Sequence, residues 1–242
     1  VRLLVPCMQC FQEFGKPSEE LSHVEIRDNG CYEIKCSHGH ETITVLQQQK
    51  FEVLFDIGAN AILDGYYREA VSSFTSSLER FYEFALRVFL EKDSKSDKQL
   101  FKDCWKNVAS SSERQLGAFF FLWATNFNEI PEHLPQNKIN FRNDVIHKGK
   151  IPTQAEAIEY GDSVLNALRP KMLAIRNKFP EEVEKVTFYH LRDCRPDVNN
   201  RKIVSTMGIP TIVSLTVDDA SHHSKSIKEH LVRLAEWRKI SW

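Results

Sequence analysis

The segment from Phe141 to Gly149 concentrates side chains that could cleave a phosphodiester. Arg142 offers a planar guanidinium with several N–H donors, a shape that suits a phosphate group. Asn143 can donate and accept hydrogen bonds, and His147 belongs to the residue type that exchanges protons near neutral pH. On a helix Asn143 and His147 share a face because they lie four residues apart, and the long Arg142 side chain reaches the same phosphate. These residues predict a site for metal-free phosphodiester cleavage.

Three lysines add positive charge around this segment. Lys138, Lys148 and Lys150 are predicted substrate-binding residues, and Asp144 is the only acidic residue among them in the sequence. A locally basic segment in a protein of formal net charge −1 favours an anionic ligand. A structural interpretation stays open, because Arg142 could pair with a carboxylate and its neighbours could cap the helix or complement its dipole.

The pattern Arg-Asn-x-x-x-His followed by Lys-Gly, between two long helical patterns, resembles the signature of the HEPN superfamily. The resemblance implies an all-helical and usually dimeric fold, and many such proteins are metal-independent ribonucleases of toxin, phage-defence and RNA-processing systems. It assigns catalysis to Arg142, Asn143 and His147, with Glu79 as a further polar contributor from a preceding helix. The expected function is a toxin or phage-defence endoribonuclease that could be restrained by an antitoxin or regulatory partner protein.

In such a reaction His147 would act as general base on the ribose 2′-hydroxyl or as acid on the leaving 5′-oxygen. Arg142 would stabilise charge on the phosphoryl group. The need for a 2′-hydroxyl makes RNA the expected substrate. Because one motif contains one histidine, a homodimer would supply both an acid and a base by bringing two copies of His147 together. The alternative function is a non-catalytic zinc-ribbon and helical-bundle module that binds nucleic acid or a partner protein.

The N-terminal region, residues 1–46, has the ligand spacing of a zinc ribbon, with Cys-x2-Cys followed by Cys-x3-His. The predicted ligands of a structural zinc ion are Cys7, Cys10, Cys36 and His40. His38 or Cys31 could replace one of them, and unligated thiols in a disordered arm are the alternative interpretation. Few large apolar side chains occur in this region, so a metal staple is expected to stabilise it. Four protein ligands leave no open position for catalysis by zinc.

Alternating residues in 24–26 and 31–35 predict strands, and Asp28-Asn29-Gly30 between them is typical of a hairpin turn. The second zinc-binding segment would then follow a strand, with Gly39 in its tight turn.

Helical periodicity dominates the middle of the chain. Helices are predicted over 51–63, 66–90 and 116–127, the last after a capping box Ser110-x-x-Glu113, and in a short segment from Lys138. A final helix starts at the capping box Thr153-x-x-Glu156 and should kink or restart near Arg169, because Pro170 lacks a backbone donor. The aromatic stripe of 66–90, together with Phe119, Phe120 and Trp123, is predicted core, and 91–98 is a predicted charged loop.

After Pro180 the periodicity changes. Strands are predicted over Val183–Leu191 and Thr211–Val217, and an amphipathic helix over Ile227–Trp237. The histidines of this region are predicted to lie at the surface or in packing contacts, and they are His190, His222, His223 and His230.

The 242 residues therefore divide into a zinc-ribbon-like region (1–46), a HEPN-like helical bundle (47–179) and an α/β appendage (180–242) of unknown role. The predicted fold class is mainly α, with a small N-terminal β ribbon. Composition is that of an ordinary globular protein, and no apolar run reaches the length of a membrane span. No secretion signal is recognisable, so a cytoplasmic location with reduced cysteines is expected.

Overall fold

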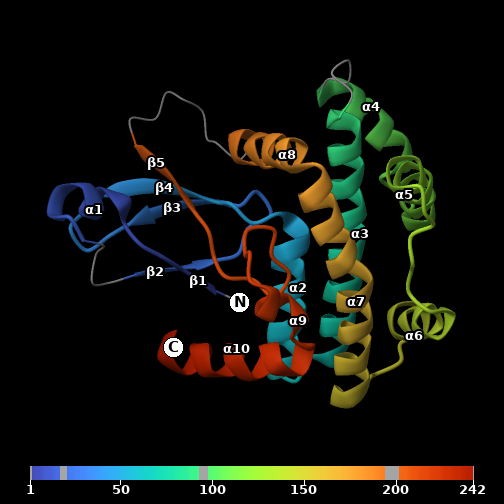
Figure 1. The fold of residues 1–242 in the computed structure, drawn as a ribbon. Coiled ribbons are helices and arrows are strands. Elements are labelled where there is room, and N and C mark those ends of the chain that lie inside the picture. Colours follow the sequence, from blue (N-terminus) through green and yellow to red (C-terminus); the bar gives the residue numbers. More distant parts are fainter. Residues whose placement is uncertain (1, 17–20, 93–97, 194–201, 242) are drawn as a thin grey trace. The chain divides into compact units, whose positions relative to one another are not determined.

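The computed structural model groups the chain into two compact units. The N-terminal unit combines the chain up to Gln48 with Thr187–Pro210, and the helical unit combines Gln49–Val186 with Thr211–Ile240. The predicted appendage 180–242 is thus divided between the two units. The residues that the structure describes are 2–16, 21–92, 98–193 and 202–241 (Figure 1).

The described residues form ten helices and five strands, which confirms the prediction of a mainly helical protein with a small N-terminal sheet. The strands are β1 (Arg2–Val5), β2 (Ser22–Glu25), β3 (Cys31–Lys35), β4 (Glu41–Leu46) and β5 (Ile203–Met207). The helices are α1 (Met8–Phe14), α2 (Lys50–Leu63), α3 (Tyr67–Glu91), α4 (Lys98–Val108), α5 (Ser112–Phe127), α6 (Gln136–His147), α7 (Gln154–Lys178), α8 (Pro180–Asp193), α9 (Ala220–Ser224) and α10 (Ile227–Ser241). No helix in the described ranges combines the length and apolar character needed to cross a membrane.

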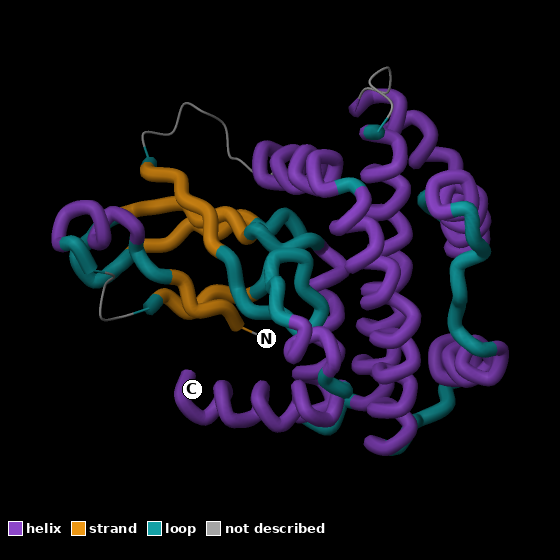
Figure 2. The backbone as a smooth tube through the Cα atoms, in the orientation of Figure 1, coloured by secondary structure: helices purple, strands orange, loops and turns teal. Residues whose placement is uncertain are grey.

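Two small sheets form the strand portion of the N-terminal unit (Figure 2). β1 pairs with β2 antiparallel, and in the other sheet β4 lies between its antiparallel partner β3 and its parallel partner β5. The predicted turn Asp28-Asn29-Gly30 does connect β2 to β3, but these strands belong to different sheets, so the hairpin prediction is wrong there. The hairpin partner of β3 is β4, and the chain between them carries Cys36 and His40.

β4 is the central strand of its sheet, and after the exposed Glu41 its side chains are buried on both faces. Thr42 and Thr44 are as inaccessible as Ile43 and Val45. β5 comes from far along the chain, as a parallel pair requires a long connection. Lys202, just before β5, forms ion pairs with Glu33 at 3.0 Å and Glu41 at 3.3 Å. The sheet of β3 and β4, which lie within residues 1–46, is therefore completed by a strand from much later in the chain.

The helical unit is built around α3, with α7 alongside it and α2, α5 and α6 packed against it (Figures 1 and 2). The predicted stripe of α3 is buried except for the half-buried Tyr67, and its Phe74 and Phe81 have no accessible surface. Phe119 and Trp123 of α5 are also buried, whereas Phe120 is half-buried. Each fully buried aromatic side chain contributes about 1.5–3 kcal/mol, so this cluster stabilises the arrangement that positions α6.

Two glycines allow α2 and α7 to approach Phe74 closely. A Cβ atom on Gly58 of α2 would lie 2.6 Å from Cε1 of Phe74. One on Gly161 of α7 would lie 2.8 Å from Cε2 of Phe74 and 2.5 Å from Cδ1 of Ile227. Carbon atoms pack without strain at about 3.5–4.0 Å, so a side chain at either position requires the neighbours to move.

The predicted capping residues of α5 and α7 and the predicted start of α6 agree with the structure to within two residues, although α5 itself begins at Ser112, four residues before the predicted 116. The Thr153 and Glu156 capping box forms at the start of α7, with the Thr153 N–H donating to the Glu156 carboxylate at 2.8 Å. The cap of α5 is Ser111, one residue after the predicted Ser110, and its hydroxyl accepts the N–H of Arg114. α6 begins at Gln136, two residues before the predicted start.

Pro170 does not end α7, so the predicted restart near it is wrong. Leu168 and Met172, on either side of Pro170, are fully buried, and their packing offsets the loss of one backbone hydrogen bond.

Helices α1, α4, α8 and α9 were not predicted from the sequence. Of the predicted charged loop 91–98, Glu91 ends α3 and Lys98 begins α4, while 93–97 lie outside the described residues.

The two strands predicted after Pro180 are both wrong, although the predicted last helix is confirmed as α10. Residues 183–191 are helical because α8 starts with Pro180 and two acidic residues, a favourable composition for a helix N-terminus. Residues 211–217 form an irregular segment. Two of its backbone N–H groups are bound by carboxylates of α2: Leu215 donates to Glu52 at 2.9 Å and Ile212 to Asp56 at 2.9 Å.

Candidate functional site

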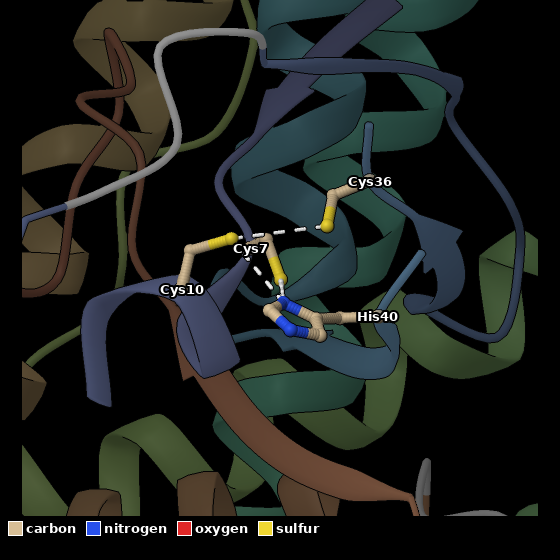
Figure 3. A group of neighbouring side chains, drawn as sticks. All are labelled: Cys7, Cys10, Cys36 and His40. Atoms are coloured by element: carbon tan, nitrogen blue, oxygen red, sulfur yellow. Dashed lines mark hydrogen bonds between the residues drawn. The ribbon is translucent and has the colours of Figure 1, made fainter. Parts of the chain in front are cut away.

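The four predicted zinc ligands come together in the N-terminal unit (Figure 3). Cys7 precedes α1 and Cys10 lies in its first turn, while Cys36 follows β3 and His40 precedes β4. Their ligand atoms all lie within 4.8 Å of one another. The cluster therefore joins the segment after β1 to the turn between β3 and β4. β1 belongs to one sheet, and β3 and β4 belong to the other.

Three of the separations between ligand atoms are close to those of a tetrahedral zinc site. A zinc ion about 2.3 Å from sulfur and about 2.0 Å from nitrogen separates two sulfurs by roughly 3.8 Å and sulfur from nitrogen by roughly 3.5 Å. The Cys10 and Cys36 Sγ atoms are 3.8 Å apart. Nδ1 of His40 lies 3.3 Å from Cys10 Sγ and 3.8 Å from Cys7 Sγ. The residues present therefore fit a structural zinc ion.

Local backbone geometry sets the Cys36 to His40 spacing. The Gly39 N–H donates to the Cys36 carbonyl at 2.9 Å, and the Cys36 N–H donates to the His40 carbonyl at 3.1 Å. Gly39 has φ of +83°, which a residue without a side chain adopts at little cost. This turn directs both side chains toward the cysteines after β1, as the sequence spacing predicts (Figure 3).

The alternative ligands lie outside this cluster. Cys31 packs against Ile43 and Val45 in a small apolar cluster. His38 is exposed, and its Nδ1 lies 3.5 Å from Cys10 Sγ, but it is not among the four mutually close ligands. The geometry therefore favours His40 over His38 and Cys31.

A cation would offset the electrostatic cost of grouping these thiols. Burial, together with the neighbouring Cys36 and Cys7 sulfurs, raises the pKa of Cys10 to about 12. At Cys36 burial also opposes ionisation, but the backbone N–H groups of His40 and His38, together with hydrogen bonds from Cys7 and Cys10, lower the pKa. Binding of a divalent metal favours the thiolate forms and would complete the site.

Arg142 and Asn143 lie on α6 of the helical unit, where their side chains are fixed together. The Arg142 guanidinium donates to Oδ1 of Asn143 at 3.0 Å and to Oε1 of Glu79 on α3 at 3.0 Å. Both partners of the ion pair are half-buried, with side-chain exposures of 21% and 26%. We refer to Arg142, Asn143, Glu79 and His147 as the Arg142 site.

His147 is the last residue of α6 and is exposed to solvent. It follows Asn143 by four residues on the same helix, so the two share a face, as predicted. The structure thus brings Arg142, Asn143 and Glu79 into direct contact, whereas no hydrogen bond or ion pair of His147 is found within the described ranges.

The basic character predicted for this segment is largely neutralised by carboxylates, of which three come from α3 and α7 and one, Asp144, lies on α6 itself. The ion pairs are Arg142 with Glu79, Lys138 with Glu159, Lys148 with Asp144 at 2.8 Å, and Lys150 with Glu156 at 2.8 Å. Counting Asp144 as the only nearby acidic residue, as the local sequence suggests, therefore overestimated the positive charge around Arg142. The pairs of Lys148 and Lys150 are exposed and contribute about 0–1 kcal/mol each, so a bound phosphate could displace them at little cost.

Tyr160 of α7 packs against the helix that carries the site and was not predicted from the sequence. Its hydroxyl bonds Thr75 of α3 at 2.8 Å, and its ring lies 5.7 Å from that of Phe141 on α6. Burial raises the pKa of Tyr160 to about 12 and keeps the hydroxyl protonated. Tyr160 follows Glu156 by four residues along α7, so the two side chains lie on the same face of that helix. Only the fold shows that this face meets α6.

Comparison with known proteins identifies no relative for this chain: no protein-family model, curated protein or solved structure matches it.

Proposed function

We propose that the protein is an endoribonuclease that cleaves RNA by attack of the ribose 2′-hydroxyl, with Arg142, Asn143 and His147 as its catalytic residues. The observation that carries the proposal is the fixed guanidinium of Arg142, held by Asn143 and Glu79 on the helix that ends with His147. An immobilised guanidinium and a solvent-accessible histidine on one short helix are the groups that such a reaction uses.

In the proposed reaction the 2′-oxygen attacks phosphorus as its proton passes to a base, and the 5′-oxygen leaves as it receives a proton from an acid. The products are a 2′,3′-cyclic phosphate and a 5′-hydroxyl. His147 performs one of the proton transfers, and His147 of a second copy performs the other in a homodimer. Arg142 stabilises the charge on the non-bridging oxygens. Lys138, Lys148 and Lys150 contact the RNA backbone after exchanging their carboxylate partners for phosphates.

The test is RNA cleavage by purified protein in EDTA. The wild type should produce ends with 2′,3′-cyclic phosphate, and RNA with 2′-deoxyribose at the cleaved position should survive. His147→Ala should lower the rate about 10²- to 10⁴-fold, because one proton-transfer group is lost. His23→Ala is the matched control, since His23 is an exposed histidine of the N-terminal unit. Equal cleavage by wild type and His147→Ala would remove this function.

A second candidate is a non-catalytic module that holds nucleic acid or a partner protein. It is favoured by the pairing of all four cations around the Arg142 site, because Arg142 then ties α6 to α3. This candidate expects binding of RNA or a protein without any RNA degradation. The role of toxin or phage-defence effector goes with the endoribonuclease candidate. If the protein has this role, expression of the wild type should arrest growth and expression of His147→Ala should not.

A further inference from the structure

Glu13 of α1 lies on the side of His40 that faces away from the cysteine sulfurs. Its Oε2 atom is 3.1 Å from Nε2 of His40. The other ring nitrogen, Nδ1, is directed at the sulfurs, 3.3 Å from Cys10 Sγ and 3.8 Å from Cys7 Sγ (Figure 3). The two nitrogens of one imidazole therefore have different partners, a carboxylate and the thiols.

Glu13 is itself held in place. Gln9, four residues earlier on α1, donates its side-chain N–H to Oε1 of Glu13 at 2.9 Å. One carboxylate oxygen is thus fixed by Gln9, and the other faces His40. α1 also supplies Cys10, so one short helix provides both a predicted metal ligand and the carboxylate behind a second ligand.

We propose that Glu13 is a positioning residue that makes Nδ1 of His40 the zinc-binding atom. A carboxylate can only accept a hydrogen bond, so the proton of the neutral imidazole resides on Nε2 and the lone pair on Nδ1 faces the metal. Such a carboxylate also orients the ring and increases the electron density that it donates to the metal.

The same contact distinguishes His40 from His38. His38 reaches Cys10, but its ring packs against Phe14 at 5.3 Å, and within the described ranges no carboxylate contact of His38 is found. Glu13 therefore selects which of two closely spaced histidines completes the site. This inference rests on zinc binding in the N-terminal unit and is independent of ribonuclease activity.

The experiment measures zinc transfer from the full-length protein to a chromogenic chelator. The wild type and Cys104→Ser, a variant of an exposed cysteine outside the cluster, should each hold one zinc ion, and Cys36→Ala should lose it. Glu13→Ala should weaken zinc binding about 10- to 100-fold. Glu13→Gln should have a smaller effect because its amide oxygen still accepts the Nε2 proton. Gln12→Ala, at a neighbouring exposed position of α1, should match the wild type.

Nitrogen NMR of the zinc-loaded wild type provides a readout that a loss of helix stability alone would not change. It should show metal on Nδ1 of His40 and a proton on Nε2. Metal on Nε2 of His40, metal on His38, a protein without zinc, or equal zinc affinity for Glu13→Ala and Gln12→Ala would each overturn the proposal.

Discussion

At the residue scale, Arg142 is distinguished by the direction of its hydrogen bonds. Its guanidinium bonds Asn143 and Glu79 through different nitrogens, so the remaining edge has a defined orientation. A lysine carries the same charge but has one nitrogen on a flexible chain and cannot reproduce this geometry.

Arg142→Lys should therefore lower kcat/KM for RNA cleavage in EDTA about 10²-fold or more, as expected for loss of an oriented donor. The free energy of unfolding should change by about 1 kcal/mol or less, because the Arg142 and Glu79 pair is partly exposed. Enzyme kinetics and urea unfolding check the two effects separately. If Arg142→Lys is much less stable than the wild type, and the wild type does not cleave RNA, the results would favour the non-catalytic module.

Glu52 of α2 is a second residue whose environment has measurable consequences. It is 2% exposed, and its carboxylate accepts the N–H groups of Gln49 and Leu215 at 2.7 and 2.9 Å. Burial raises its pKa from 4.5 to about 7, against the opposing effect of these hydrogen bonds. Between these pKa values the unfolded chain releases the proton while the folded protein retains it, so stability falls as pH rises.

Glu52→Gln removes this titration. The variant loses a hydrogen bond to a backbone N–H and should be less stable than wild type at pH 5.5 by about 1–3 kcal/mol. The difference in free energy of unfolding between wild type and variant should shrink by about 2 kcal/mol between pH 5.5 and 8. Over that interval only the wild type must ionise the buried Glu52 carboxyl. Urea unfolding at several pH values measures the difference, and a constant difference would contradict the assignment.

At the element scale, the contact of α2, α3 and α7 depends on glycines at the points of closest approach. Gly161→Ala should destabilise the protein by about 1–3 kcal/mol, because the added methyl group overlaps Phe74 and Ile227. Gly117→Ala on α5 is the matched control, since no heavy atom lies within 4 Å of its Cβ position. This control should gain up to about 1 kcal/mol from higher helix propensity. Thermal unfolding of both variants tests the packing, and equal stabilisation by both substitutions would contradict it.

At the scale of the whole molecule, charge and stoichiometry limit the proposed activity. The net charge is −1, and the cations around the Arg142 site are paired, so long-range attraction of RNA is weak. One chain also provides one His147, whereas the reaction needs an acid and a base.

The active protein is therefore expected to be a homodimer formed through the helical unit. Light scattering at micromolar concentration should give about twice the mass of one chain, with or without RNA. A catalytically active protein that remains monomeric in both conditions would show that the second proton-transfer group comes from elsewhere in the chain.

The sequence alone determined the features that depend on neighbours close along the chain. The spacing of Cys7, Cys10, Cys36 and His40 predicted the cluster of possible metal ligands, since each pair is positioned by a turn or a helix start of a few residues. Helical periodicity and capping residues located α2, α3 and α7, because the groups involved are three or four residues apart.

Only the tertiary structure decided the features that depend on distant partners. β5 has its position because β4 offers a free edge, and residues 211–217 are irregular because Glu52 and Asp56 bind their N–H groups in place of a strand. Likewise, Glu79 of α3 neutralises Arg142 and Glu159 of α7 neutralises Lys138, and local sequence does not bring these partners together. In each case a backbone N–H group or a cation binds a partner that is far away in the sequence. Packing of the core brings the two partners together.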